Sequence, residues 1–235
     1  MSDSHNTLSN INSKIRINLY RGMELVIGSD LAKELYMRIC VNRYRSAGVV
    51  FVHVPRAGGT SIANSVLGRR AGHFKAEEIR SIMGDKEFRE MFSFAVVRNP
   101  FDRLVSAYHY ASQGGGVDGG ILRKRDYKSH KFSSFETFVK EWLVYQDMAN
   151  VDVIFKPQYD FVASEDGVIV DYVGRLEELT DAECVVSSKL GRRVIFGHRN
   201  SSKRMLGYRR YYDFEMIKLV ERVYQKDISY FGYKF

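Results

Sequence analysis

The stretch from Val49 to Leu67, VVFVHVPRAGGTSIANSVL, decides the fold of this chain. It begins as a short apolar run rich in β-branched residues, which is typical of a buried strand, and that run stops at Pro55. Two glycines follow, and from Thr60 onward the apolar residues recur at helical spacing. The stretch therefore predicts a strand, a tight loop and a helix.

The loop between this strand and this helix is predicted to bind an anion. The first N–H groups of a helix have no backbone partners, and the positive end of the helix dipole lies behind them. Thr60 and Ser61 are predicted to cap the helix, and Arg56 adds a positive charge beside Gly58 and Gly59. A phosphate or a sulfate suits such a loop.

The Walker A loop of ATP and GTP enzymes does not match this stretch. In that motif a lysine follows the last glycine directly and precedes Ser or Thr. Here the basic residue, Arg56, precedes the glycines, and no lysine separates Gly59 from Thr60. A simple strand-to-helix turn is the alternative if the loop is considered alone.

A second stretch, FSFAVVRNPFDRLVSAYHY from Phe92 to Tyr110, repeats the arrangement. Its strand pattern ends at Arg98, and Pro100 suits the first turn of the helix that follows. Arg98 and Ser106 are predicted to hold a second anion through charge-assisted hydrogen bonds. Two such units predict one ligand with two phosphate-like ends.

These motifs resemble those of sulfotransferases that use 3′-phosphoadenosine 5′-phosphosulfate (PAPS). VPRAGGTS resembles the 5′-phosphosulfate loop of that family, and RNPFDRLVSAY resembles its 3′-phosphate motif. The resemblance is to the carbohydrate branch of the heparan and chondroitin type, sulfotransferase family 2, and it covers roughly Gly48 to Phe235. It implies PAPS as the donor, adenosine 3′,5′-bisphosphate (PAP) as the product, and no metal.

The resemblance places donor binding in three parts of the chain. The candidate residues are Arg56, Ala57, Gly58, Gly59, Thr60 and Ser61 in the loop, Arg98 and Ser106 in the second motif, and Ser201, Ser202, Lys203 and Arg204 in the segment HRNSSKR.

In the reaction that the resemblance implies, an acceptor hydroxyl attacks the sulfur in line. His73 is the candidate base, because the family carries a histidine in a Gly-His motif and imidazole titrates near neutral pH. Glu77 and Glu78 are the alternatives. Arg56 and the glycine loop are predicted to stabilise charge on the leaving phosphate.

The sequence departs from the family pattern at Arg56, where a lysine is usual. Arginine keeps the charge and donates in a planar fork, but it does not replace a lysine point charge. If the lysine contact is essential, we expect slow turnover or an unusual donor.

The resemblance implies a carbohydrate or glycolipid acceptor, which we expect to carry negative charge, and no nucleic-acid partner. The chain carries a formal net charge of +8, which favours anionic partners. The resemblance implies that Gln158 and Tyr159 in KPQYDFV help to bind the acceptor, and the basic cluster Arg123, Lys124 and Arg125 is a further candidate because of its charge. A solvated charge run explains that cluster equally well.

Strands alternating with helices predict an α/β fold, with a parallel sheet covered on both faces and the ligand at the carboxyl ends of the strands. The resemblance implies the same three-layer architecture, related to that of P-loop nucleoside triphosphatases. We expect an N-terminal tail and helical extension over residues 1–47 and one sulfotransferase domain over residues 48–235. A third strand is predicted over Val168 to Val173.

Several later helices have recognisable starts. Ser133, Thr180 and Asp213 are predicted to cap three of them. An earlier helix is predicted from about Asp30, with an apolar side that contains Leu31, Leu35, Met37 and Ile39.

No run of residues is apolar and long enough to span a bilayer, and the first residues contain no signal-like core. Golgi members of the family that the sequence resembles carry an N-terminal membrane anchor, and this difference predicts a cytoplasmic enzyme of bacterial origin. Cys40 and Cys184 are expected to be buried thiols.

Two functions of other classes remain as alternatives. A nucleotide-dependent phosphoryl transferase would require magnesium. A noncatalytic module that binds polyanions would show strongly salt-dependent affinity.

Overall fold

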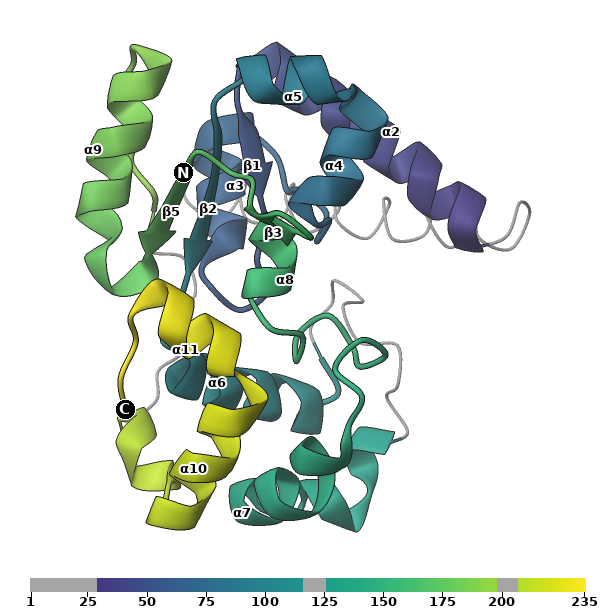
Figure 1. Ribbon diagram of the computed structural model, residues 1–235, viewed down its shortest axis with the longest axis vertical. Coiled ribbons are helices and arrows are strands. Elements are labelled where there is room, and N and C mark those ends of the chain that lie inside the picture. The colour runs from purple at the N-terminus through teal and green to yellow at the C-terminus, as the bar shows by residue number, and fades with distance from the viewer. Residues whose placement is uncertain (1–28, 116–125, 198–206) are drawn as a thin grey trace, which may run out of the picture.

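A three-stranded parallel sheet in the order β1-β2-β5 lies between helices in the upper part of the molecule in Figure 1. The structure, a computed structural model, describes residues 29–115, 126–197 and 207–235. The strands are β1 (Val50–Val52), β2 (Ser93–Val97) and β5 (Tyr172–Arg175). Val52 pairs with Ala95, and Ala95 pairs with Val173 on its other side. Because all three strands are parallel, their carboxyl ends meet at one edge.

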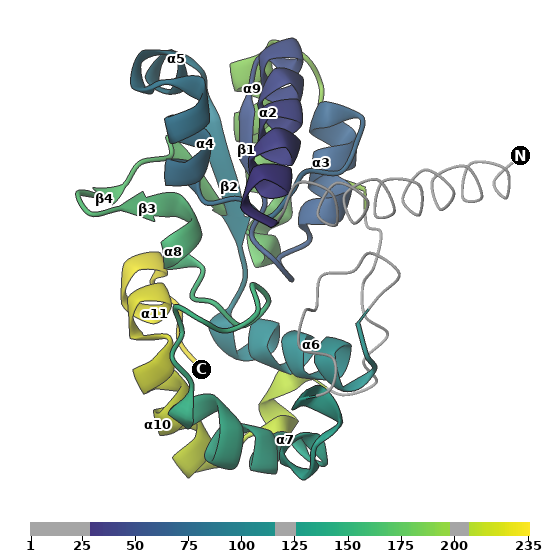
Figure 2. The ribbon, with the colours of Figure 1, turned by 90° about the vertical axis from the view of Figure 1, so that its right-hand side faces the viewer.

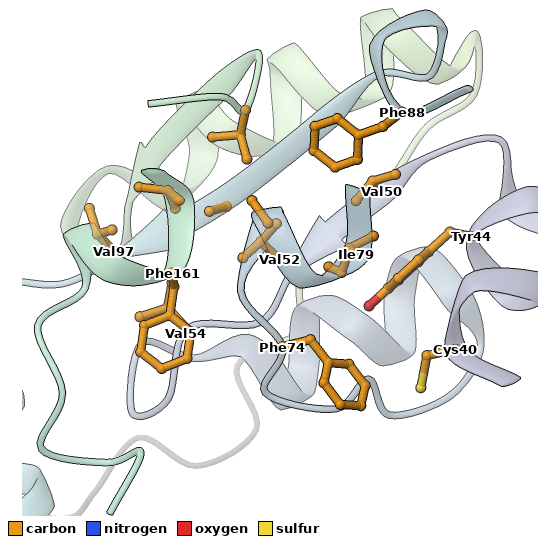
Figure 3. Close-up of a cluster of buried hydrophobic side chains, with 14 of the residues drawn as sticks. Cys40, Tyr44, Val50, Val52, Val54, Phe74, Ile79, Phe88, Val97 and Phe161 are labelled. Atoms are coloured by element: carbon orange, nitrogen blue, oxygen red, sulfur yellow. The ribbon is translucent and has the colours of Figure 1, made fainter. Parts of the chain in front are cut away.

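The sheet is covered by helices on both faces, which confirms the predicted three-layer α/β architecture. Alternate residues of a strand point to opposite faces, so Val50 and Val52 join one apolar cluster and Phe51 joins another. The first cluster, part of which is drawn in Figure 3, packs against α2 (Ser29–Ala47), α4 (Ala76–Met83), α5 (Asp85–Glu90) and α8 (Tyr159–Val162). The second packs against α3 (Gly59–Leu67) and α9 (Leu179–Leu190).

A third apolar cluster is built from helices and turns beyond the carboxyl end of β2. Its longest members are α6 (Pro100–Ser112) and α10 (Phe214–Val223), which Figures 1 and 2 show in the lower part of the molecule. The chain between them contributes η1 (Asp126–Lys128), η2 (His130–Phe132), α7 (Phe135–Thr137), η3 (Phe138–Trp142), η4 (Leu143–Tyr145) and η6 (Tyr208–Tyr211). α11 (Gln225–Phe231) ends the chain's helices, and η5 (Leu176–Glu178) precedes α9.

The predicted third strand was placed too early in the sequence. Val168 belongs to β4 (Gly167–Val168), which pairs antiparallel with β3 (Ala163–Ser164). The chain joins the main sheet only at Asp171, whose carboxylate accepts hydrogen bonds from the N–H and the hydroxyl of Ser93 at 2.7 and 2.8 Å. The apolar run therefore spans two strands of different sheets.

Helix α2 forms as predicted and buries Met37 as expected, but the other three residues of its predicted apolar side do not face the core. Leu31, Leu35 and Ile39 are exposed, and the helix packs through a face of mostly smaller residues: Ala32, Met37, Cys40, Val41 and Tyr44. Their packing against β1 and α4 overrides the preference for burying the largest aliphatic side chains. Cys40 is buried as expected, whereas Cys184 is exposed. The division of the chain at residue 47 stays a prediction.

One of the three predicted caps is confirmed. Asp213 accepts a hydrogen bond from the N–H of Met216 at 2.7 Å and so caps α10. α9 begins at Leu179 without a side-chain cap, so Thr180 lies inside it. Ser133 closes the preceding turn through its own N–H, and the cap of α7 is the next residue, Ser134.

Among the residues that the structure describes, no helix has the length and apolar character needed to cross a membrane.

The two neighbouring serines allow a direct test of the α7 cap. Ser134 Oγ accepts the N–H of Thr137 at 3.0 Å, so Ser134→Ala is expected to lower the free energy of unfolding by about 1 kcal/mol. Ser133→Ala, the matched control, is expected to change it by less than about 0.5 kcal/mol. Urea unfolding measures both, and equal effects would contradict the cap assignment.

Candidate anion-binding site

The two predicted anion motifs meet at the carboxyl edge of the sheet. β1 and β2 are adjacent and parallel, so the loop at residues 53–58 lies beside the turn at residues 98–99. Nη1 of Arg98 donates to the carbonyl oxygen of Arg56 at 3.3 Å. Nε of Arg103, a buried residue of α6, donates to the carbonyl oxygen of Pro55 at 2.9 Å. The second motif therefore holds the backbone of the first.

The two glycines of the loop are required by its backbone and by its packing. Gly58 is the N-cap of α3 and has a left-handed conformation with φ 76°, which favours glycine. A Cβ atom on Gly59 would lie 2.0 Å from Cδ2 of His53. The predicted capping by Thr60 and Ser61 is wrong, because α3 begins at Gly59 and has no side-chain cap. A helix that begins at glycine still presents its first N–H groups toward the loop.

Arg56 connects the loop to α6 through its side chain. Its Nη2 and Nε donate to Ser106 Oγ at 2.8 and 3.2 Å, and its guanidinium lies 4.4 Å from the ring centroid of Tyr110. Among the described residues, it is the one non-glycine residue with a positive φ, 67°. This backbone conformation is uncommon for a residue with a Cβ, and it carries the guanidinium to the second motif.

Arg98 is held on α6 as well. Its Nε and Nη2 donate to Oδ2 of Asp102 at 2.8 and 2.5 Å. Through Arg56, the structure brings Arg98 and Ser106 into one hydrogen-bonded cluster. Their joint binding of an anion stays a prediction, and the contact of Arg56 with Ser106 was not predicted from the sequence.

His73 lies beside the start of the loop. Its Nδ1 is 3.0 Å from the carbonyl oxygen of His53. Because a carbonyl oxygen only accepts hydrogen bonds, Nδ1 carries the proton and Nε2 of the neutral ring carries the lone pair. The contact therefore selects the tautomer in which Nε2 can accept a proton.

The two alternative bases have structural contacts. Glu78 accepts the N–H of Lys75 at 2.8 Å at the start of α4, and its other oxygen lies 2.5 Å from Nζ of Lys33. Glu77 is exposed and pairs with Arg80 at 3.6 Å. Of the three candidates, His73 has the contacts that best suit a base.

His53 lies buried beneath the loop. No role for this histidine was predicted from the sequence. Burial lowers the pKa of His53 well below the ordinary value of 6.5, and the nearby His73 and Arg70 act in the same direction. Nδ1 of His53 donates to the carbonyl oxygen of Ala71 at 3.1 Å. The neutral ring packs against Gly59 and so supports the start of α3. The sequence feature that could have indicated this role is the position of His53 within the apolar run from Val49 to Val54.

The predicted acceptor residues lie in different surroundings. Gln158 is fully buried, so it does not face an acceptor-binding surface. Tyr159 is partly buried, with its ring centroid 5.2 Å from that of Tyr230. Ala57 is buried in the apolar core and can meet a ligand only through its backbone. The remaining predicted site residues lie outside the described residues: Arg123, Lys124, Arg125, Ser201, Ser202, Lys203 and Arg204.

The fold and the site together define a class of protein. They describe an α/β protein in which two strand-loop-helix motifs meet at the carboxyl edge of a parallel sheet, the edge at which open α/β sheets bind ligands. The sequence profile of the sulfotransferase family matches residues 42–234, and the chain belongs to this family. Among curated proteins and solved structures there is no significant match.

The packing of Gly59 predicts a large effect of one added methyl group. Gly59→Ala places that group 2.0 Å from His53 and is expected to lower the free energy of unfolding by about 1–3 kcal/mol. Gly207→Ala is the control, because a Cβ there meets nothing within 4 Å. Urea unfolding compares the two variants, and a Gly59→Ala protein as stable as the wild type would show that this close approach is wrong.

The pKa of His53 predicts a loss of stability in mild acid. The unfolded chain binds a proton at this residue near pH 6.5, whereas the folded protein does not. The contribution of the neutral His53 to the free energy of unfolding is therefore complete above this pH. It decreases as the pH falls, by roughly 1 kcal/mol from about pH 7.5 to about pH 5.5. Denaturant unfolding of the wild type and of His53→Gln at both pH values measures this difference. Identical pH dependence in the two proteins would contradict the buried, neutral state.

Proposed function

We propose that the protein transfers a sulfuryl group from PAPS to a hydroxyl group of a carbohydrate or glycolipid. Membership of the sulfotransferase family supports sulfotransfer in general. The observation that carries the choice of donor is the meeting of two anion loops at one edge of the sheet. PAPS has a phosphate at one end and a phosphosulfate at the other, which matches two such sites.

The residues present fit the two ends of this donor. Gly58 allows the left-handed turn that leads into α3, and the first turn of that helix adds N–H groups and the hydroxyls of Thr60 and Ser61. Arg98 and Ser106 would hold the 3′-phosphate, with Arg56 between the two sites. The scheme requires no metal ion.

His73 is the proposed base. The donor supplies an activated sulfuryl group attached to a phosphate oxygen. Nε2 of His73 takes the proton of the acceptor hydroxyl, while Nδ1–H stays on the carbonyl oxygen of His53 and orients the ring. Arg56 and the N–H groups of the loop stabilise the negative charge that the leaving phosphate acquires.

An anionic acceptor is supported by the charges near His73. Lys75 lies two residues beyond His73 in the chain. Burial lowers the pKa of Lys156, and the positive charges of Lys75 and Lys33 lower it further. Lys75 and Lys156 would attract a carboxylate or sulfate on the acceptor, whereas Lys33 is paired with Glu78. We propose that Tyr159, beside Lys156, borders the same region.

The reaction predicts a specific effect of losing His73. His73→Ala is expected to lower kcat by roughly 10²- to 10⁴-fold because the proton acceptor is lost, while the affinity for PAP stays unchanged. The measurement is transfer of radiolabelled sulfate from PAPS to a panel of acidic polysaccharides and glycolipids without magnesium. His130→Ala is the control, since His130 is exposed and pairs with Glu141.

Three outcomes would count against the proposal. Unchanged kcat in His73→Ala removes this residue from the mechanism. Magnesium-dependent transfer of phosphate from ATP would identify a phosphoryl transferase. If the protein binds polyanions tightly and in a salt-dependent way but does not bind PAP, it is a noncatalytic module.

A further inference from the structure

Gln158 holds both backbone polar groups of Arg98. Its Oε1 accepts the N–H of Arg98 at 2.9 Å, and its Nε2 donates to the carbonyl oxygen of Arg98 at 2.8 Å. The Gln158 side chain is fully buried. One side-chain amide therefore forms hydrogen bonds with both the N–H and the carbonyl oxygen of Arg98, which lies 60 positions away in the sequence.

This contact continues the sheet by one residue. The pairing of β2 with β5 ends at Val97 and Arg175. A side-chain amide offers one donor and one acceptor, as a neighbouring strand does. Gln158 thus takes the place of a strand at the point where the Arg98 side chain leaves the sheet for α6.

Gln158 is anchored in turn by Asp227 of α11. The two carboxylate oxygens of Asp227 accept the N–H groups of Gln158 and Tyr159 at 2.9 and 2.8 Å. Asp227 is fully buried, and the charge of Arg103 lies near it. Movement of Gln158 would therefore break hydrogen bonds in the protein interior, which is costly.

The residue after Arg98 is held in a similar way. Oε1 of Glu177 accepts the N–H of Asn99 at 2.8 Å, and Oε2 accepts the hydroxyl of Tyr233 at 3.0 Å. Side chains from distant segments thus position two consecutive residues at the end of β2. The side chains of Arg98 and of the buried Asn99 add further bonds, to Asp102 and to the backbone of Lys234.

We propose that Gln158 is a positioning residue of the 3′-phosphate site. It sets the point from which Arg98 reaches the 3′-phosphate, so selectivity for a nucleotide with that phosphate depends on a side chain that lies within the core. This inference rests on the proposed donor. It replaces the sequence-based assignment of Gln158 to the acceptor.

The test compares two nucleotides that differ only in the 3′-phosphate. Calorimetry gives the Kd of PAP and of adenosine 5′-monophosphate for the wild type and for Gln158→Met, which conserves volume and removes both bonds. We expect the affinity for PAP to fall roughly tenfold or more because Arg98 is displaced. The affinity for adenosine 5′-monophosphate should stay within about twofold, since that nucleotide does not use Arg98.

Tyr224→Phe is the matched control. It removes another buried hydrogen bond of the same segment, from Tyr224 to the carbonyl oxygen of Phe155 at 2.7 Å. It should lower thermal stability and leave the ratio of the two Kd values unchanged. Equal losses for both nucleotides in Gln158→Met, or no loss for PAP, overturn the proposal.

A second variant covers the case in which Gln158→Met does not fold. Asp227→Asn keeps Gln158 and weakens its anchor, so it should also reduce the preference for PAP, and an unchanged preference overturns the proposal. A wild type without preference for PAP refutes the proposed donor and this inference with it. A selective wild type with equally selective variants refutes this inference alone.

Discussion

The site depends on the contacts that arginines make between the loop after β1 and the start of α6. Arg103 holds the carbonyl oxygen of Pro55, and Arg98 holds that of Arg56. Burial lowers the pKa of Arg103, and its Nη2 has no hydrogen-bond partner among the described residues. Burying such a cation is unfavourable unless it is compensated, and the nearby Asp227 supplies negative charge. These contacts place the glycine loop beside the second motif, and the proposed binding of one ligand by both motifs depends on this placement.

Much of the fold was predictable because strand and helix patterns depend on local residue spacing. Two of the three sheet strands and the helix after each of them follow from apolar runs that end at Pro55 or Arg98. The third strand was misplaced because an apolar run does not show which sheet it joins, and the carboxylate of Asp171 decides that point. The exposure of Leu31, Leu35 and Ile39 on α2 was also not predicted, since tertiary packing selects which face of a helix is buried.

The residues of the site were predictable where they belong to one continuous motif. The contacts between segments that are distant in the sequence were not. The placement of Arg98 at the end of β2 and of Ser106 on the following helix was predictable from one motif, but the guanidinium of Arg56 on Ser106 spans 50 residues and comes from a residue with a left-handed backbone. Gln158 was assigned to the acceptor because it lies in KPQYDFV, a segment that resembles the part of the family that lines the acceptor cleft. Its burial and its hydrogen bonds to Arg98 appear only in the folded chain. Long-range polar contacts of this kind have no periodic signature in sequence.

We propose that the two motifs bind one nucleotide through both of its phosphate-bearing ends. The most direct measurement is calorimetric titration of the protein with PAP, without magnesium, alongside Arg98→Ala and Ser106→Ala. If both motifs bind the nucleotide, the wild type should bind PAP with micromolar or tighter affinity. Each variant should bind at least roughly tenfold more weakly, because each loses a bond to the 3′-phosphate. Absent binding to the wild type, or variants that bind as tightly as it does, would contradict the claim.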